Sequence, residues 1–296
     1  MGIAVHDVIY SLQSLPDGPG KYHAIGRTEI GGGVAANAAV AVSRLGGQSR
    51  YIGPVGDDSL GDRIVRDLKS EGVDTDNVRL VPGVNSPLSA IAVAAGGERI
   101  IINHSDDRLF EEAGSMTGSD LAGSDAVLAD VRWVEGAAVT LQWAKEQGIP
   151  GVLDYDVGNR PSASLLPLAS HVVLSADALQ QLTGTSDITD GLQSIRKETS
   201  GWLGVTNGEE GTYWIEDDAL RRHPTFEVAV VDTTGAGDVY HGALALALSR
   251  GVDDMSEAIE FASAAAALTC TTFGGRNGIP TGDEVRTFLA KRKRAG

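Results

Sequence analysis

The 296-residue sequence is poor in several features, and each shortage narrows what the protein can be. It has a single cysteine, Cys270, so no disulfide can form within the chain, which predicts a reducing, cytoplasmic location. No apolar run reaches the roughly 18 residues that could span a bilayer, and no signal peptide is recognisable. Basic residues number only 24 against 40 acidic ones, a net charge of -16. That charge argues against nucleic acid or an anionic membrane as a partner.

The sequence is rich in glycine, with 38 residues, and its hydrophobic content of 42% is enough for a large core. Short β-rich runs alternate with helical patterns of about 10–15 residues, and one such run spans 225–231. This alternation predicts an α/β fold, with a central, mainly parallel sheet covered by helices on both faces. Functional sites in such folds lie at the carboxyl ends of strands.

Two segments interrupt the alternation. Residues 10–30 include an extended run from 21 to 30, and residues 86–104 hold two β-rich runs joined by Ala95-Gly96-Gly97, a hairpin signal. We interpret them as a small inserted β lid. The core would then comprise residues 1–9, 31–85 and 105–296. A lid over a site excludes water, which would otherwise compete with a hydroxyl acceptor.

The most informative stretch is VDTTGAGDVYHGALALAL, Val231 to Leu248. Gly235-Ala236-Gly237 predicts a tight turn, followed by a helix over 236–249 with Asp238 in its first turn. Backbone N–H groups and the helix dipole would converge there on an anion, and Asp238 could accept a proton from a nucleophile. Phosphoryl transfer to a hydroxyl needs this combination. A carboxylate at a helix N-terminus should be stabilised as the anion, and hence be a weak base. The alternative is an ordinary capped helix.

The string DTTGAGD resembles the signature of the ribokinase-like (PfkB) carbohydrate kinases, and no P-loop motif is present. The resemblance implies a ribokinase-like three-layer α/β/α fold and an enzyme that uses ATP and Mg²⁺. It implies that Asp238 is the base and that the N–H groups of Gly235, Ala236 and Gly237 hold charge on the phosphoryl group. It also suggests that Asp232 and Thr234 bind a monovalent cation such as K⁺, with carbonyls from residues 274–278.

A second glycine-rich stretch, GGGVAANAAVAVSRLGG, begins at Gly31. Glycines allow the backbone to approach a sugar, and an asparagine offers a donor and an acceptor to hydroxyls. Gly32, Gly33 and Asn37, with Asp7 upstream, are therefore the expected sugar ligands; helix packing is the alternative. In related kinases a complete first strand ends in a glycine and then an aspartate. Gly2 and Asp7 would fill those places, so most of that strand is expected to be missing.

For the nucleotide, the resemblance indicates the loop after a strand at VTNGEEG, with Thr206, Gly208 and Glu209, and more weakly Asn277 and Gly278. One motif departs from the family. The Asn-x-x-Glu pair that positions magnesium in many members is replaced by Ser175 and Ala178. The absence of this pair indicates either a particular subfamily that lacks it or an inactive member of the family.

The finer resemblance is to 6-deoxy-6-sulfofructose 1-kinases, with ketohexokinase-like features. It implies ATP-dependent phosphorylation of the C1 hydroxyl of a ketohexose with an anionic C6 group, gripped by Lys21, Asn103 and Arg132. Two cations and an amide suit a tetrahedral anion. The alternatives are a neutral fructokinase or ketohexokinase, a 6-phosphofructokinase, a nucleoside kinase, or a binding regulator without activity. An exposed lid edge, and the family, suggest a homodimer through the lids.

Overall fold

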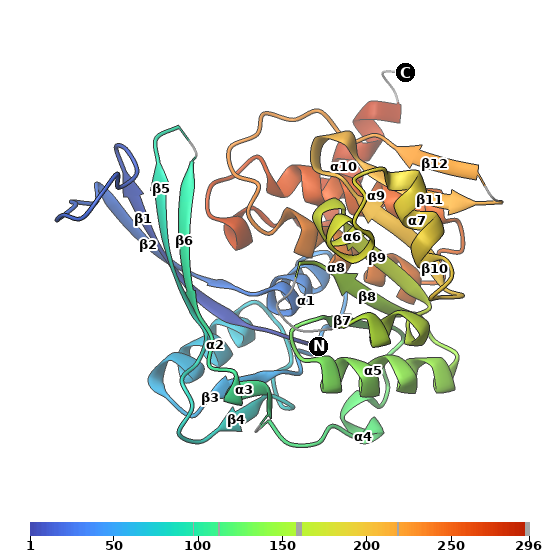
Figure 1. Ribbon diagram of the computed structural model, residues 1–296, viewed down its shortest axis with the longest axis horizontal. Coiled ribbons are helices and arrows are strands. Elements are labelled where there is room, and N and C mark those ends of the chain that lie inside the picture. Colours follow the sequence, from blue (N-terminus) through green and yellow to red (C-terminus); the bar gives the residue numbers. More distant parts are fainter. Residues whose placement is uncertain (97, 112, 158–161, 218, 294–296) are drawn as a thin grey trace.

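A six-stranded sheet forms the centre of the main body (Figure 1), in the order β12-β11-β10-β9-β8-β7. The structure is a computed structural model, and it describes all residues except 97, 112, 158–161, 218 and 294–296. Strands β7 to β10 are parallel, and β11 and β12 continue the sheet antiparallel. The strands are β1 Val5–Leu12, β2 Gly26–Gly32, β3 Pro54–Gly56, β4 Arg79–Val81, β5 Leu88–Ala94, β6 Arg99–His104, β7 Val127–Asp130, β8 Gly151–Tyr155, β9 His171–Ser175, β10 Trp202–Thr206, β11 Thr212–Glu216 and β12 Ala219–His223.

Helices cover both faces of this sheet. The helices are α1 Val34–Arg44, α2 Ser59–Ser70, α3 Arg108–Glu111, α4 Gly118–Leu121, α5 Val134–Gln147, α6 Ala176–Thr183, α7 Ile188–Ile195, α8 Ala236–Ser249, α9 Met255–Thr269 and α10 Gly282–Lys293, with 3₁₀ turns η1 Ala163–Leu168, η2 Gly208–Glu210 and η3 Gly275–Gly278. One hydrophobic cluster packs α5, α6 and α7 against the sheet, and a second packs α1, α8 and α9 against its other face. The predicted three-layer α/β/α arrangement with a mainly parallel sheet is confirmed.

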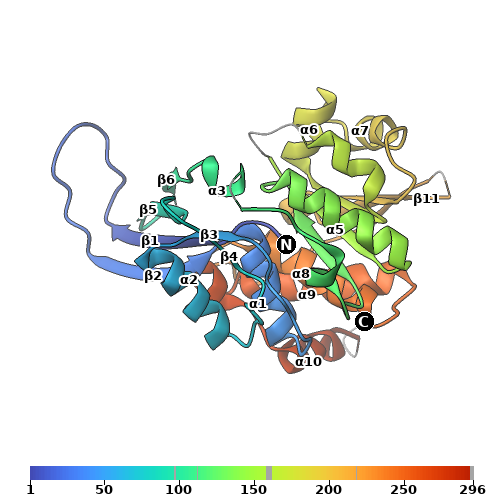
Figure 2. The same ribbon diagram turned by 90° about the horizontal axis from the view of Figure 1, so that it is seen from below.

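A separate four-stranded sheet, in the order β2-β1-β5-β6, projects from the main body (Figures 1 and 2). It joins the two predicted lid segments, since β1 pairs with β2 and β5, and β5 pairs with β6. The sheet also takes in Val5–Ile9 and Gly31–Gly32, which lie outside the predicted lid boundaries. Every residue of the edge strand β6 is exposed. The predicted hairpin between β5 and β6 is present, although its Gly97 lies outside the described residues.

Several sequence expectations about local structure are wrong. The predicted strand over 225–231 is an irregular connection, because the N–H groups of Val231 and Asp232 bond to the carbonyl of Cys270 rather than to a strand. Strands β4 and β12 had not been predicted. Helix α2 is capped by Asp58, whose side chain accepts from the N–H of Gly61. None of the helices among the described residues is long and apolar enough to cross a membrane.

Candidate active site

The glycine turn before α8 has the predicted geometry. Gly235 lies in the left-handed region with φ 75°, and α8 begins at Ala236. The N–H of Ala236 donates a long 3.3 Å bond to the Thr233 carbonyl. A methyl group added at Gly237 would meet no atom within 4 Å. The turn therefore presents its glycine side to open space, where a phosphoryl group could approach.

Asp238 and Asn37, which are 201 residues apart, meet at this turn. The side-chain amide of Asn37 donates to Asp238 Oδ2 over 2.7 Å. Asn37 is buried in the first turn of α1, and α1 packs along α8. Gly33 is the N-cap of α1, with φ 92°, and a side chain there would lie 2.6 Å from the carbonyl of Ile3. The predicted sugar ligand and the predicted base are thus adjacent.

The ionisation of Asp238 differs from the sequence expectation. Burial raises its pKa to about 7, and the nearby negative charge of Asp154 acts in the same direction. The hydrogen bond from Asn37 and the proximity of His241 oppose the rise. The prediction that Asp238 is a weak base is wrong, because loss of solvent around the carboxylate raises its pKa. A base with this pKa is suited to proton transfer near neutral pH.

A buried acid–imidazole pair lies directly behind Asp238. His241 Nδ1 is 3.0 Å from Asp154 Oδ2 and 2.7 Å from the carbonyl of Gly237. Burial disfavours the charged imidazole, but Asp154 and these hydrogen bonds prevail and raise the pKa of His241. The sequence analysis missed both residues. The available signals were a histidine inside the otherwise small and apolar helix α8 and an aspartate within the buried strand β8.

The four-stranded sheet brings two predicted sugar ligands into one row. Asp7 on β1 is opposite Ser89 on β5, which is opposite Asn103 on β6. Ser89 Oγ accepts from the Asn103 amide over 3.2 Å, and Ser89 also bonds to Asp7. Burial raises the pKa of Asp7, although Ser89 and the charge of Arg276 oppose it. A side chain at Gly32 would overlap the Asp7 carboxylate and displace it.

Arg132 and Lys21 are not brought together with Asn103 by any recorded contact among the described residues. Arg132 follows β7, with its backbone N–H bonded to Asp130 and a guanidinium nitrogen 3.9 Å from Asp156 Oδ2. Lys21 is exposed in the connection between β1 and β2, which extends away from the main body in both views (Figures 1 and 2). Within one chain, the geometry gathers Asn103 with Asp7 and leaves Lys21 apart.

The predicted cation site has a different arrangement from the one expected. Asp232 Oδ1 accepts from the backbone and hydroxyl of Thr234, and Oδ2 accepts from the N–H groups of Gly274 and Gly275. Burial tends to raise the pKa of Asp232, but these hydrogen bonds lower it. The guanidinium of Arg99, from β6, donates to Thr234 Oγ1 over 2.8 Å and lies 3.7 Å from Asp232. The loop of residues 274–278 does reach Asp232, but it presents N–H groups to the carboxylate instead of carbonyls. The positive charge beside Asp232 is the guanidinium of Arg99. These residues do not fit a bound monovalent cation.

The predicted nucleotide residues occupy two loops. Thr206 ends β10, and Gly208 and Glu209 form η2 after it. Asn277 and Gly278 lie in η3, whose Gly275 approaches Thr234 beside the turn. None of the hydrogen bonds recorded for the described residues joins Thr206, Gly208 or Glu209 to the turn. Across the described part of the chain, no group of three acidic, histidine or cysteine side chains is arranged to hold a metal ion.

One further residue of the site, Arg276, was not selected in the sequence analysis. Arg276, in η3, has only 6% of its surface exposed. Its Nε donates to Asn37 Oδ1 over 3.0 Å, and its Nη2 donates to the Gly32 carbonyl over 3.1 Å. A loop arginine is ordinarily solvated, so composition gave no signal. The adjacent Gly31, where a side chain would overlap the guanidinium, was the available clue.

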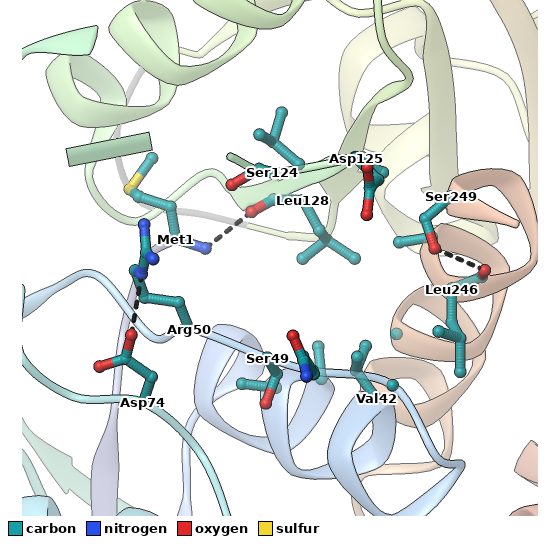
Figure 3. Close-up of a pocket in the computed structure, with 18 of the residues that line it drawn as sticks. Met1, Val42, Ser49, Arg50, Asp74, Ser124, Asp125, Leu128, Leu246 and Ser249 are labelled. Carbon is teal, nitrogen blue, oxygen red and sulfur yellow. Dashed lines mark hydrogen bonds and ion pairs between the residues drawn. The ribbon is translucent and has the colours of Figure 1, made fainter. Parts of the chain in front are cut away.

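A separate cavity lies away from the turn (Figure 3). It has a volume of about 690 Å³ and lies between α1, α8 and the region of β7, with Met1, Val42 and Leu246 in its lining. Arg50, paired with Asp74, and the bond from the Met1 amine to the Leu128 carbonyl border it. Neither Asp238 nor Asn37 lines this cavity.

The expectation from the sequence that most of the first strand of related kinases is missing stays a prediction.

Comparisons with known proteins extend over nearly the whole chain. A family model described as pfkB family carbohydrate kinase matches residues 1–282. Fructokinase-1 of Zea mays is 32% identical, covering 88% of each chain, and an ATP-dependent ribose-1-phosphate kinase of Halopiger xanaduensis is 31% identical, covering 97% of this chain and 95% of the relative. A solved structure from Agrobacterium tumefaciens, named provisionally as a ribokinase, superposes with a TM-score of 0.93 at 39% identity, covering 99% of this chain and 97% of that one.

Proposed function

Because this chain belongs to the pfkB family of carbohydrate kinases, we propose that it transfers the γ-phosphoryl group of ATP to the C1 hydroxyl of a ketohexose with an anionic C6 group, such as sulfofructose. The observation that carries the reaction type is the contact between Asn37 and Asp238 beside the glycine turn. The ATP-dependent relative acts on a phosphorylated sugar by name, which supports an acceptor with an anionic group.

In this proposal Asp238 takes the proton of the acceptor hydroxyl. The hydroxyl oxygen forms a bond to the γ-phosphorus while the bond from that phosphorus to ADP breaks, and Mg²⁺ bound to ATP supplies charge neutralisation. The N–H groups of Gly235, Ala236 and Gly237 would bind the phosphoryl oxygens, aided by the helix dipole, with the long bond from Ala236 to the Thr233 carbonyl giving way. The pKa of Asp238, about 7, makes the carboxylate a stronger base than an exposed one while leaving much of it ionised near neutrality.

For the acceptor, we propose that Asp7, Gly32, Gly33 and Asn37 bind the sugar hydroxyls and that Asn103, Arg132 and Lys21 bind the anionic end. Asn37 has an amide hydrogen to spare, since one amide hydrogen serves Asp238 and its oxygen serves Arg276. Arg132 is only weakly paired, at 3.9 Å from Asp156, so a sulfonate or phosphate can replace that partner.

The four-stranded sheet would act as a lid, and the lid segments expected from the sequence are residues 10–30 and 86–104. Its link through Arg99 to Thr234 supports closure over the turn. Thr206, Gly208, Glu209, Asn277 and Gly278 would contact ATP. Ile101 and Ile102 on β6, 55% and 68% exposed, support pairing of two copies through this sheet. Whether Lys21 reaches the anionic end of the sugar would then depend on the position of the lid. A cytoplasmic location stays a prediction.

The test is ADP release by the full chain with ATP and Mg²⁺, measured against sulfofructose, fructose, fructose 6-phosphate, ribose and adenosine. The proposal predicts the highest kcat/KM for sulfofructose and phosphate transfer to its C1 oxygen. A preference for fructose would favour the neutral acceptor suggested by the name of the Zea mays relative. Preference for ribose or adenosine, or turnover of none of the five, would overturn the proposed acceptor.

A further inference from the structure

Arg276 enters the site through a path that only a glycine leaves open. It starts in η3, between α9 and α10, and its guanidinium is buried against β2 and α1. A methyl group on Gly31 would overlap its Nη1. Burial lowers the pKa of Arg276 to about 10, while the charges of Glu71 and Asp7 act against that fall. The guanidinium is therefore a cation at neutral pH.

The contact with Asn37 determines which way that amide points. An asparagine side chain has an oxygen at one side and an NH₂ group at the other, whereas arginine can only donate hydrogen bonds. Because Arg276 Nε faces one side of the amide at 3.0 Å, the oxygen must be on that side. The NH₂ group must then face Asp238, where it donates over 2.7 Å. A reversed amide would place two donors together on one side and two acceptors on the other.

The same residue links two parts of the site. Its backbone follows Gly274 and Gly275, whose N–H groups hold Asp232 at the start of the turn. Its side chain holds the Gly32 carbonyl and, through Asn37, the carboxylate of Asp238 at the end of the turn. The loop before α10 is thus joined to both ends of the turn.

We propose that Arg276 is a positioning residue that fixes the amide of Asn37 so that its NH₂ group stabilises the Asp238 carboxylate, and that it thereby couples the η3 loop to the sugar side of the site. This inference rests on the proposed function only for its kinetic consequence. The orientation itself can be measured whether or not a sugar is turned over.

The charged groups that face Asp238 come from several elements. Asp154 on β8 and Asp156 after it are negative and favour the protonated acid. His241, on the same helix, and Arg276, from η3, favour the carboxylate. Removing Arg276 deletes a cation and releases the Asn37 amide, and both changes move the Asp238 titration upward.

Arg44 is a matched control. It donates to the carbonyls of Arg276 and Ile279 over 2.9 and 3.1 Å, and it pairs with Glu71. It therefore holds the backbone of the same loop without contacting Asn37 or Gly32. A variant at Arg44 reports what loosening of the loop does on its own.

The experiment follows the ¹³C resonance of the Asp238 carboxyl through a pH titration of the full chain, with Asp238→Asn used to assign the signal. Arg276→Ala should raise the midpoint by about one pH unit, and Arg44→Ala should leave it within about 0.3 unit. An equal midpoint in Arg276→Ala and wild type would overturn the proposal. If the alanine variant does not fold, Arg276→Lys replaces it, since lysine keeps the charge but lacks the planar fork that binds two acceptors. The midpoint of the Asp238 titration should then rise by less than in Arg276→Ala. An unchanged midpoint in Arg276→Lys would contradict the proposal.

Steady-state kinetics provide the second measurement. With an acceptor that wild type uses, Arg276→Ala should lower kcat about 100-fold with the KM for ATP changed less than about threefold. Added guanidinium should restore part of kcat in Arg276→Ala and none in Asp238→Asn. A loss no greater than that of Arg44→Ala, without rescue, would contradict the positioning role. Absence of ADP release by wild type would instead count against the proposed function, and the carboxyl titration would still decide the role of Arg276.

Discussion

The turn at α8 and the four-stranded sheet differ in how they are built. The turn leads into a helix with ten buried residues. The hydrogen bond from Asn37 to Asp238 and the buried pair of His241 with Asp154 stabilise it. The four-stranded sheet ends in β6, whose six residues are all exposed, and its link to the turn is the half-exposed Arg99. This difference suggests that the turn determines the reaction, whereas residues outside it, on the projecting sheet and at the end of β7, determine which sugar is accepted.

The largest effect should come from removing the base in the turn. Asp238→Asn keeps the shape and can still accept from Asn37, but it cannot take a proton. We expect kcat to fall by about 10³-fold or more, since general-base catalysis contributes about 10²–10⁴-fold, while the affinity for ATP stays within about threefold. Initial rates of ADP release and a nucleotide-binding titration measure both quantities.

The matched control for this substitution is Asp177→Asn. Asp177 also lies in the first turn of a helix that follows a strand, but it is exposed and outside the site. Its variant should retain the wild-type rate. Turnover of Asp238→Asn within a few-fold of wild type would remove Asp238 from the proposed role.

A smaller and selective effect should follow from changing Arg132. Arg132→Ala removes one charge-assisted contact to an anionic C6 group, a change of about 1.5–3 kcal/mol, so kcat/KM for sulfofructose should fall about 10–100-fold. The rate with neutral fructose should change less than about twofold. Equal losses with both sugars would show that Arg132 supports the structure of the site instead of recognising the anion.

The stability of the turn should depend on pH. In the unfolded chain Asp238 ionises near its ordinary value of 3.8, and in the folded chain near 7. Between these values the folded protein keeps a proton that the unfolded chain has lost, so stability falls as pH rises, and the loss is complete above about 7. Asp238→Asn should therefore raise Tm by about 2–4 °C at pH 8 and by less at pH 5.5. Thermal unfolding at both pH values, with Asp177→Asn as reference, measures this; an equal shift at both pH values would be inconsistent with a perturbed carboxyl.

The smallest effect is expected for the link between the two regions. Arg99→Ala removes a half-exposed contact to Thr234 and Asp232, and such pairs contribute about 0.2–1 kcal/mol. We expect kcat/KM to fall no more than about fivefold, with faster amide exchange in β6. Arg221→Ala, which breaks an exposed pair with Glu216 on the other sheet, should change neither. Full activity with unchanged exchange in Arg99→Ala would mean that this contact does not hold the sheet over the turn.

The same contrast explains how much could be predicted from the sequence. Helix α8 and the glycine turn before it were predicted at the observed position because a glycine turn and a helix start are local features. The pKa of Asp238 was predicted in the wrong direction because its burial and the nearby charge of Asp154 both come from packing that no short motif contains. The run at 225–231 has β propensity, but the N–H of Val231 bonds to the Cys270 carbonyl instead of to a strand.

Contacts between distant segments were the hardest to predict. Arg276 and Asn37 are 239 residues apart, and only the fold brings a loop arginine to the start of α1. Ser89 was missed because its contacts with Asp7 and Asn103 arise from the strand register that places it opposite both residues. Strand register depends on pairing across the sheet, and a single strand sequence does not contain it.

The most direct test of this division of roles is the ratio of kcat/KM for sulfofructose to kcat/KM for fructose, measured in wild type, Asp238→Asn and Arg132→Ala. The account predicts a ratio well above one in wild type. Asp238→Asn should lower both rates and leave the ratio unchanged, whereas Arg132→Ala should bring the ratio close to one with the fructose rate preserved. A ratio that changes in Asp238→Asn but not in Arg132→Ala would contradict the account.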